Sequence, residues 1–116
     1  MFSTVFCLQL LLYSYNVLGD IVQNSISIDE FLKLSNVNII DIRSIQAFNN
    51  NHIPGSINIP YQKLLAEPSK YLSFGKIYYL YCQKGYSSYK ISNILNSFGY
   101  KTISINGGYE EWILKR

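Results

Sequence analysis

Residues 77–99 limit the possible folds of this chain most strongly, because they contain a complete strand, loop and helix pattern. Ile77–Tyr81 is a run of β-branched and aromatic residues, as expected for a strand that is covered on both faces. Cys82 and a short polar, glycine-containing stretch follow, and they predict a tight loop that opens a helix. Apolar residues then recur at helical spacing until Gly99, which is placed to end the helix. The pattern predicts a parallel α/β sheet with this strand near its centre.

The rest of the chain shows the same alternation of short strands and helices. Apolar runs predict further strands at residues 37–42, 56–59 and 102–105, with a short first strand near 21–22 or at Ile26. Helical patterns are expected at residues 31–34 behind the capping box of Ser27 and Glu30, at 45–49, weakly at 61–72 with a break at Pro68, and after the glycine pair 107–108. We therefore predict one α/β domain over residues 21–116, with a mainly parallel sheet flanked by helices.

Length, composition and charge narrow the function classes. A chain of 116 residues fits a single domain, and 48% hydrophobic with 15% charged residues is typical of a compact globular chain. The formal net charge of +3 comes from scattered lysines. Since nucleic-acid binding needs a basic stripe, no nucleic-acid partner is expected, whereas small anionic substrates are weakly favoured.

The cysteine and histidine content argues against disulfides and metals. Cys7 and Cys82 are too few for a disulfide scaffold, so a reducing, cytoplasmic location is the default expectation. His52 is the single histidine and no cysteines lie close together, so neither a metal site nor a cofactor is expected. Cys7 has apolar neighbours, which favour an inert buried thiol.

Residues 1–20 form an apolar N-terminal extension with several readings. No lysine or arginine precedes Lys33, and polar residues interrupt the apolar run. A secretory signal normally begins with basic residues, and a spanning helix needs about 20 cleaner apolar residues, so neither template fits well. Three interpretations remain: an extra helix packed on the domain, a membrane anchor, or a degenerate export signal. The second implies membrane contact through residues 1–19, and the third implies export.

Cys82 is the expected nucleophile. A thiol at the carboxyl end of a strand, before a helix, faces backbone amides and the positive end of the helix dipole, an environment that stabilises a thiolate and holds an anion. A buried, inert cysteine is the alternative. The expected anion-binding residues are those of the loop and first helical turn: Gln83, Lys84, Gly85, Tyr86, Ser87 and Ser88.

Three motifs occur in a fixed order along residues 21–116. The first joins Asp41-Ile42-Arg43 to H-I-P-G-S-I-N-I-P at residues 52–60. The second is Y-C-Q-K-G-Y-S-S at residues 81–88, and the third combines F-G-Y at 98–100 with N-G-G-Y-E-E-W at 106–112. In this order the three resemble the rhodanese domain family, whose patterns include D-x-R, H-I-P-G-A-x-N-x-P, Y-C-x-x-G-x-[RS]-S and a glycine pair before a tryptophan.

The resemblance implies a thiosulfate sulfurtransferase that works through a persulfide on Cys82, with a small anionic sulfur donor and cyanide, a thiol or a thioredoxin-like protein as acceptor. A persulfide carrier or a binding and docking module is the alternative. Related phosphatases and arsenate reductases place an arginine where this chain has Ser88, so phosphoryl or arsenate chemistry is disfavoured.

The resemblance also implies which residues support the site, and the chain departs from the family pattern at two positions. It implies that Asp41, Arg43 and His52 are structural, and that His52 fixes its loop by hydrogen bonding. Ala47 stands where members usually have a glutamate, so Arg43 is expected to find another partner, Asp41 or Glu110. Ser87 stands where many members have an arginine, which removes one cation that could bind a sulfonate.

Overall fold

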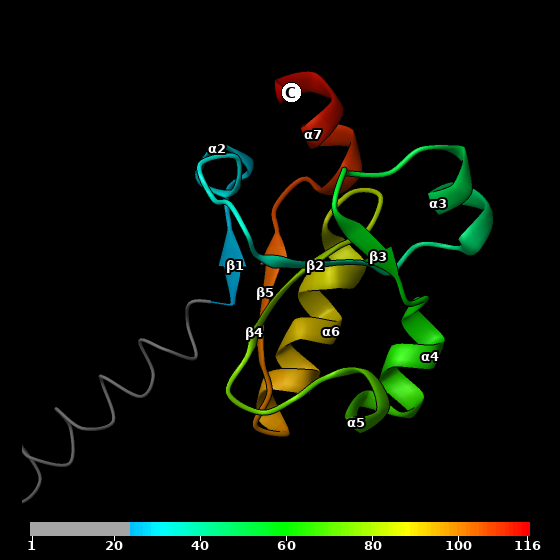
Figure 1. Cartoon of the computed structure of the whole chain (residues 1–116), viewed down its shortest axis with the longest axis vertical. Helices are drawn as coiled ribbons and strands as arrows, with labels where there is room; N and C mark the ends of the chain where they lie inside the picture. Colours follow the sequence, from blue (N-terminus) through cyan, green and yellow to red (C-terminus); the bar gives the residue numbers. More distant parts are fainter. Residues whose placement is uncertain (1–23) are drawn as a thin grey trace, which may run out of the picture.

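A parallel five-stranded sheet organises residues 24–116, the part of the chain that the computed structural model describes (Figure 1). Its strands are β1 (Ser25–Ile26), β2 (Asn38–Asp41), β3 (Ser56–Asn58), β4 (Ile77–Tyr81) and β5 (Lys101–Ile105). They are ordered β1-β5-β4-β2-β3, and each neighbouring pair is parallel. The prediction of a parallel sheet with the strand before Cys82 at its centre is confirmed.

Helices connect the strands and cover both faces of the sheet. They are α2 (Ile28–Phe31), α3 (Ile45–Asn50), α4 (Tyr61–Ala66), α5 (Pro68–Tyr71), α6 (Tyr86–Ser97) and α7 (Gly108–Lys115). Helix α6 packs on β4 and β5 and also contacts α4, whereas α2 and α7 contact each other. The carboxyl ends of the parallel strands all meet at one edge of the sheet, and the loop after β4 opens there into α6.

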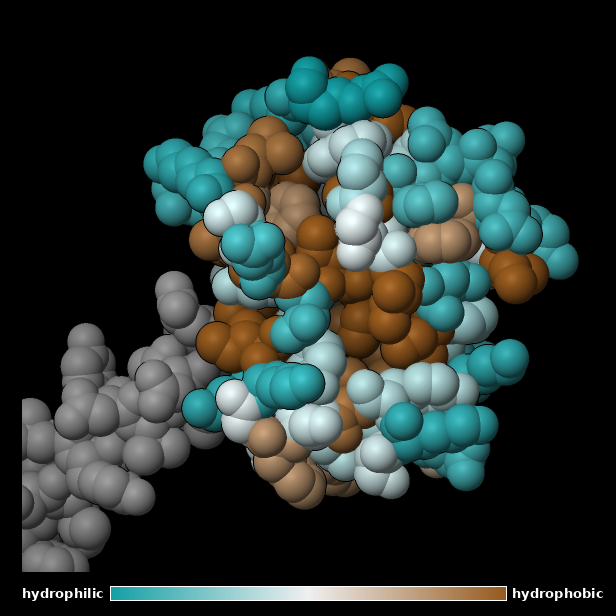
Figure 2. All heavy atoms as spheres, viewed as in Figure 1, coloured by the Kyte–Doolittle hydropathy of each residue, from teal (hydrophilic) through white to brown (hydrophobic). Residues whose placement is uncertain are grey.

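The alternation of side chains along the strands divides the core into two clusters. From β4, Tyr78 and Leu80 join the cluster on the α4 and α6 side, and Tyr81 joins the one on the α2 and α7 side. The α6-side cluster includes Ile40, Ile42, Ile59, Leu64, Leu72, Ile91, Leu95 and Tyr100, and the α7-side cluster includes Ile28, Phe31, Ile53, Ile105, Tyr109 and Trp112. Figure 2 shows apolar residues across the middle of one face of the molecule and hydrophilic residues around its rim.

One helix prediction needs correction, and another is confirmed. Ser27 does cap α2, since its side chain accepts a hydrogen bond from the Glu30 amide, but α2 starts at Ile28 and ends at Phe31 instead of covering residues 31–34. The capping signal marked the helix start, but after Phe31 the chain forms a turn at Leu32 and Lys33. The predicted break of the 61–72 helical pattern at Pro68 is confirmed: α4 ends at Ala66, and Pro68 occupies the first position of α5, because proline cannot continue a helix but fits its first turn.

The expectations for residues 1–20, for Cys7 and for a strand at 21–22 lie outside the described residues. Within residues 24–116, no helix is long and apolar enough to cross a membrane.

Candidate active site

Cys82 lies directly after β4, at the carboxyl edge of the sheet and at the mouth of the loop that leads into α6. Cys82 is 8% exposed, so its side chain is mostly buried but lies close to the surface. Gly85 precedes α6 with a φ of 99°, a left-handed conformation that glycine adopts without steric cost. The chain therefore turns back within a few residues and brings the start of α6 against the Cys82 side chain.

Backbone amides of the loop and of α6 converge on the sulfur. The Gly85 amide lies 3.1 Å and the Ser88 amide 3.3 Å from Cys82 Sγ, and Ser88 Oγ lies 3.4 Å away. The amides of Tyr86 and Ser87, at the first two positions of α6, have no partner within the helix. Donors of this kind, together with the positive end of the α6 dipole, stabilise negative charge on the sulfur or on an atom bonded to it.

The carbonyl groups at the start of the loop are held on its other side by helix α7. The amides of Tyr109 and Glu110 donate hydrogen bonds to the carbonyl oxygens of Cys82 (2.9 Å) and Gln83 (3.1 Å). Gly108 allows this approach: its φ is 61°, and a Cβ there would contact the Cys82 carbonyl oxygen and lie 2.8 Å from that of Gln83. The loop therefore has its carbonyls fixed at α7.

The two glycine-containing turns also touch each other directly. A Cβ at Gly85 would lie 2.8 Å from the Gly107 amide nitrogen, closer than packed atoms normally approach. The sequence interpretation treated the glycine pair 107–108 only as a turn before the last helix. Its contact with the cysteine loop was missed, although the glycine pair itself is the signal for a close backbone approach.

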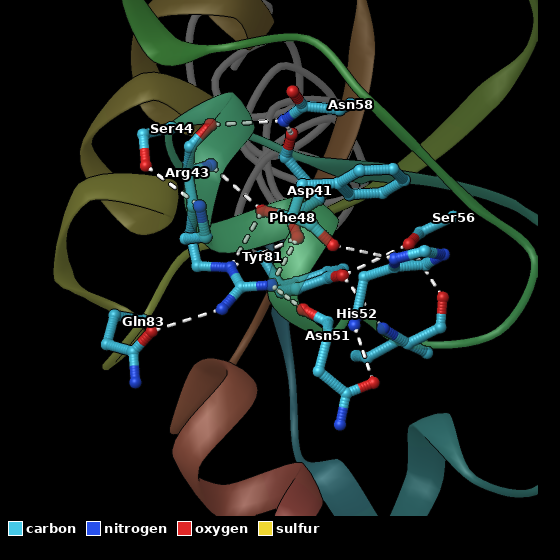
Figure 3. Close-up of polar contacts among 12 residues, drawn as sticks. Asp41, Arg43, Ser44, Phe48, Asn51, His52, Ser56, Asn58, Tyr81 and Gln83 are labelled. Carbon is cyan, nitrogen blue, oxygen red and sulfur yellow. Dashed lines mark hydrogen bonds and ion pairs between the residues drawn. The ribbon is translucent and has the colours of Figure 1, made fainter.

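Asp41 and Arg43 form a buried ion pair, and Arg43 contacts the loop after Cys82 through the Gln83 side chain (Figure 3). Arg43 Nε lies 3.1 and 3.0 Å from the two carboxylate oxygens of Asp41, and Nη2 lies 2.7 Å from one of them. Burial alone would lower the pKa of Arg43, but the hydrogen bonds and charge of Asp41 outweigh burial and raise it.

The same guanidinium reaches the loop and helix α7. Arg43 Nη1 donates to Gln83 Oε1 at 3.3 Å, and Gln83 Nε2 donates to Glu110 Oε2 at 3.2 Å. The guanidinium also lies 4.2 Å from the centre of the Tyr109 ring, within range of a cation–π interaction. Asp41 is thus the direct partner of Arg43, and Glu110 is connected to it through Gln83. Both side-chain amide atoms of Gln83 are engaged in this network, so only its backbone N–H could bind an anion.

Tyr81 and His52 hold the loop that carries the first motif. The Tyr81 hydroxyl accepts a hydrogen bond from the Ile53 amide at 3.0 Å and pairs with Ser56 Oγ at 3.0 Å. Burial raises the pKa of Tyr81, and these two hydrogen bonds lower it only in part. His52 Nδ1 lies 2.9 Å from the Phe48 carbonyl oxygen, and its ring stacks on Phe48 at 3.8 Å (Figure 3). The imidazole therefore ties its loop to helix α3.

A pocket of about 350 Å³ opens beside the cysteine loop. Its lining residues are Lys84, Gly85, Tyr86, Tyr89, Asn106 and Gly107. Tyr86 is 79% exposed, so it lines the pocket without being packed into the core. Lys84 is the one basic residue among those that line the pocket, and it places a positive charge next to the cysteine loop.

Residues 24–116 contain no group of three or more histidine, cysteine, aspartate or glutamate residues that could hold a metal ion. The arrangement around Cys82 is suited to nucleophilic chemistry on an anionic substrate.

Comparison with known proteins gives a consistent family match. A family model described as Rhodanese-like domain matches residues 27–115. Thiosulfate sulfurtransferase GlpE of Tolumonas auensis is 33% identical over 82 residues, which are 70% of this chain and 76% of the relative. GlpE of Pseudomonas syringae is 31% identical over 75 residues, 64% of this chain and 70% of the relative.

Solved structures give the same fold. A rhodanese-related protein from Thermoplasma volcanium superposes with a TM-score of 0.71 at 28% identity, covering 79% of this chain and 92% of that protein. The human single-domain sulfurtransferase TSTD1 superposes with a TM-score of 0.69 at 24% identity, covering 80% of this chain and 97% of that protein. At that identity the second match supports the fold alone.

Proposed function

The chain belongs to the rhodanese-like domain family, and on this basis we propose that it transfers sulfane sulfur from thiosulfate or a similar donor to a thiophilic acceptor through a persulfide on Cys82. The observation that supports this most directly is the convergence of the Gly85 and Ser88 amides on Cys82 Sγ at the start of α6. Curated relatives named thiosulfate sulfurtransferase support the same reaction class.

The first half-reaction forms the persulfide. The Cys82 thiolate attacks the outer sulfur of thiosulfate, a new S–S bond forms, and the bond to the sulfonate sulfur breaks with its electron pair, so that sulfite leaves. The negative charge then lies on the terminal sulfur of the persulfide. The amides of Gly85, Tyr86, Ser87 and Ser88, at the start of α6, would donate to this charge.

The second half-reaction returns the enzyme to its thiolate form. Cyanide or a thiolate attacks the terminal sulfur, and the Cys82 thiolate leaves with the electron pair of the S–S bond. Neither step requires a protein base to remove a proton from the reacting sulfur once Cys82 is ionised, which agrees with the engagement of His52 by Phe48 of helix α3. In this mechanism the fixed amides are the main source of stabilisation.

Lys84 is the residue that we expect to attract the donor. It is exposed, and it lines the pocket beside the loop, where an ammonium group favours the sulfonate end of thiosulfate electrostatically. Lys84→Ala should therefore raise KM for thiosulfate several-fold and leave kcat nearly unchanged. Lys76→Ala is the matched control, because it removes the same charge from an exposed position before the amino end of β4.

Phosphoryl transfer is disfavoured by the same geometry. Ser88 occupies the position that would need an arginine fork, and it is fully buried against the core. A planar guanidinium could not be placed there to bind a phosphate with two hydrogen bonds without displacing core atoms.

A persulfide carrier fed by a protein partner is the second candidate. Tyr86 and Tyr89 are 79% and 46% exposed beside the loop, and exposed aromatic residues next to a reactive group suit contact with a protein such as a thioredoxin-like thiol acceptor. A carrier would form the same persulfide on Cys82 but turn over small molecules slowly.

The test is thiocyanate release from thiosulfate and cyanide by the full chain, with Cys82→Ser beside it. The proposal predicts turnover that requires Cys82. Slow turnover with rapid sulfur delivery to reduced thioredoxin would favour the carrier, whereas equal rates for the variant and the unmodified protein would contradict both.

A further inference from the structure

A chain of two buried hydroxyl groups leads from strand β5 to the sulfur of Cys82. Ser104 in β5 and Ser88 in the first turn of α6 are both fully buried, and their Oγ atoms lie 2.7 Å apart. Ser88 Oγ in turn lies 3.4 Å from Cys82 Sγ. Ser104 is thus connected to the sulfur through a single intervening hydroxyl.

The direction of these hydrogen bonds follows from counting protons. Within residues 24–116, Ser88 Oγ is the only acceptor within hydrogen-bond distance of the Ser104 hydroxyl. If Ser88 donated to Ser104 instead, the buried Ser104 proton would have no acceptor, which costs free energy, so Ser104 donates its proton to Ser88. The single proton of Ser88 is then left for one of two acceptors, Cys82 Sγ or the Gly85 carbonyl oxygen at 3.3 Å.

The second acceptor can lose this proton without being left unpaired. The Gly85 carbonyl oxygen also accepts the Tyr89 amide at 3.2 Å, the first hydrogen bond of α6. The Ser88 hydroxyl can therefore turn from Gly85 toward Cys82 at little cost. A neutral thiol would donate to Ser88 Oγ, and an ionised sulfur would receive the Ser88 proton instead.

We propose that Ser104 is a positioning residue, which fixes the Ser88 hydroxyl so that its proton points at Cys82 whenever the sulfur is negatively charged. The role extends to the persulfide only if the proposed function holds, but for the thiolate it is independent of any sulfur donor. Without Ser104, the Ser88 oxygen has a free lone pair and its proton is no longer directed, so the thiolate loses part of its stabilisation.

The chain contains a matched control for this argument. Ser92 lies one helical turn after Ser88 on the same helix and is also fully buried, but its hydroxyl has no hydrogen-bond partner among the described residues. Removing it changes a buried hydroxyl near the same strand without touching the connection to Cys82.

The experiment measures the rate of Cys82 alkylation by iodoacetamide against pH, in full-length protein with Cys7→Ser so that Cys82 is the one thiol. Ser104→Ala should move the midpoint of the profile upward by about half a unit to one unit. Ser88→Ala should move it at least as far, and Ser104→Ala added to Ser88→Ala should move it no further. Ser92→Ala should leave it unchanged.

Ser104→Thr separates packing from hydrogen bonding, since it disturbs the same site but keeps the hydroxyl; it should keep the original midpoint even where it lowers the melting temperature. An unchanged midpoint in Ser104→Ala, or full additivity of the two alanine variants, would overturn the inference. Alkylation needs no sulfur donor, so the two proposals can fail separately. If Ser104→Ala shows the expected shift of the alkylation midpoint but the protein forms no persulfide, only the proposed function is refuted. If the protein forms a persulfide but the midpoint does not shift in Ser104→Ala, only the role of Ser104 is refuted.

Discussion

The Tyr109 amide donates a 2.9 Å hydrogen bond to the carbonyl oxygen of Cys82, the residue whose sulfur accepts the Gly85 amide at 3.1 Å. The amino ends of two helices therefore act on one residue: α7 binds its carbonyl, and α6 faces its side chain. A carbonyl dipole that turned toward the sulfur would oppose negative charge there. Helix α7 prevents this by fixing the carbonyl on the other side of the loop.

Gly108→Ala tests this arrangement. Alanine disfavours the positive φ of Gly108, and its Cβ would overlap the carbonyl oxygens of Cys82 and Gln83, which are backbone atoms held by hydrogen bonds to α7. Gly75→Ala is the control, because Gly75 also has a positive φ but nothing lies within 4 Å of its missing Cβ. We expect Gly75→Ala to cost about 1–2 kcal/mol in the free energy of unfolding, measured by urea titration.

Gly108→Ala should exceed that cost by at least about 1–2 kcal/mol and also slow alkylation of Cys82. Equal costs for the two variants, with Cys82 reactivity preserved in both, would show that the close approach of α7 to the loop is unimportant.

The buried Asp41–Arg43 pair should matter far more for stability than a surface pair. Arg43→Ala leaves a fully buried carboxylate without its partner, and such losses cost about 3–5 kcal/mol. Lys33→Ala removes a cation from an exposed pair with Glu30, in which both side chains are more than half exposed, and should cost no more than about 1 kcal/mol. Denaturant unfolding of the two variants measures the difference, and similar costs would mean that Asp41 is well solvated without Arg43.

Tyr81 should make the protein less stable in alkaline solution. Burial raises the pKa of its phenol in the folded protein above the ordinary value of 10.0. Its contribution is therefore complete below pH 10 and is lost as the pH rises above 10, because the unfolded chain ionises first. In this range the free energy of unfolding should fall more steeply than in Tyr81→Phe, by up to about 1.4 kcal/mol per pH unit. Parallel slopes for the two proteins would contradict a raised pKa.

His52→Ala should affect stability and leave the sulfur chemistry unchanged. The variant loses the contact with the Phe48 carbonyl and the stacking of the two rings, which together are worth about 1–2 kcal/mol. The pH profile of Cys82 alkylation should coincide with that of the unmodified protein. A displaced profile would place His52 in the active site, contrary to its assigned role.

The fold was largely predictable because its signals are local. The apolar run Ile77–Tyr81, the glycines at 85 and 99 and the helical spacing between them predicted the central strand and the position of Cys82 without any long-range information. The end of the first helix was misplaced, because Leu32 continues the apolar pattern of Ile28 and Phe31 but already lies in a turn. Propensity identifies that a helix starts but gives little information about where so short a helix ends.

The supporting contacts of the site could not be predicted because they join residues that are distant in the sequence. Ser88 meets Ser104, and Gln83 connects Arg43 to Glu110, only after β4, β5 and the two following helices have packed at particular angles. No local pattern distinguishes Ser104 from the other polar residues of β5. The ion pair of Asp41 with Arg43 was among the alternatives named, since the two lie close in sequence.

The most direct test of the account is the intact mass of the protein after incubation with thiosulfate alone, followed by removal of the donor. The account predicts that each chain gains one sulfur atom, that cyanide removes it, and that Cys82→Ser gains none while Cys7→Ser gains as much as the unmodified protein. No mass gain in the unmodified protein, or a gain that persists in Cys82→Ser, would contradict the claim that Cys82 carries the transferred sulfur.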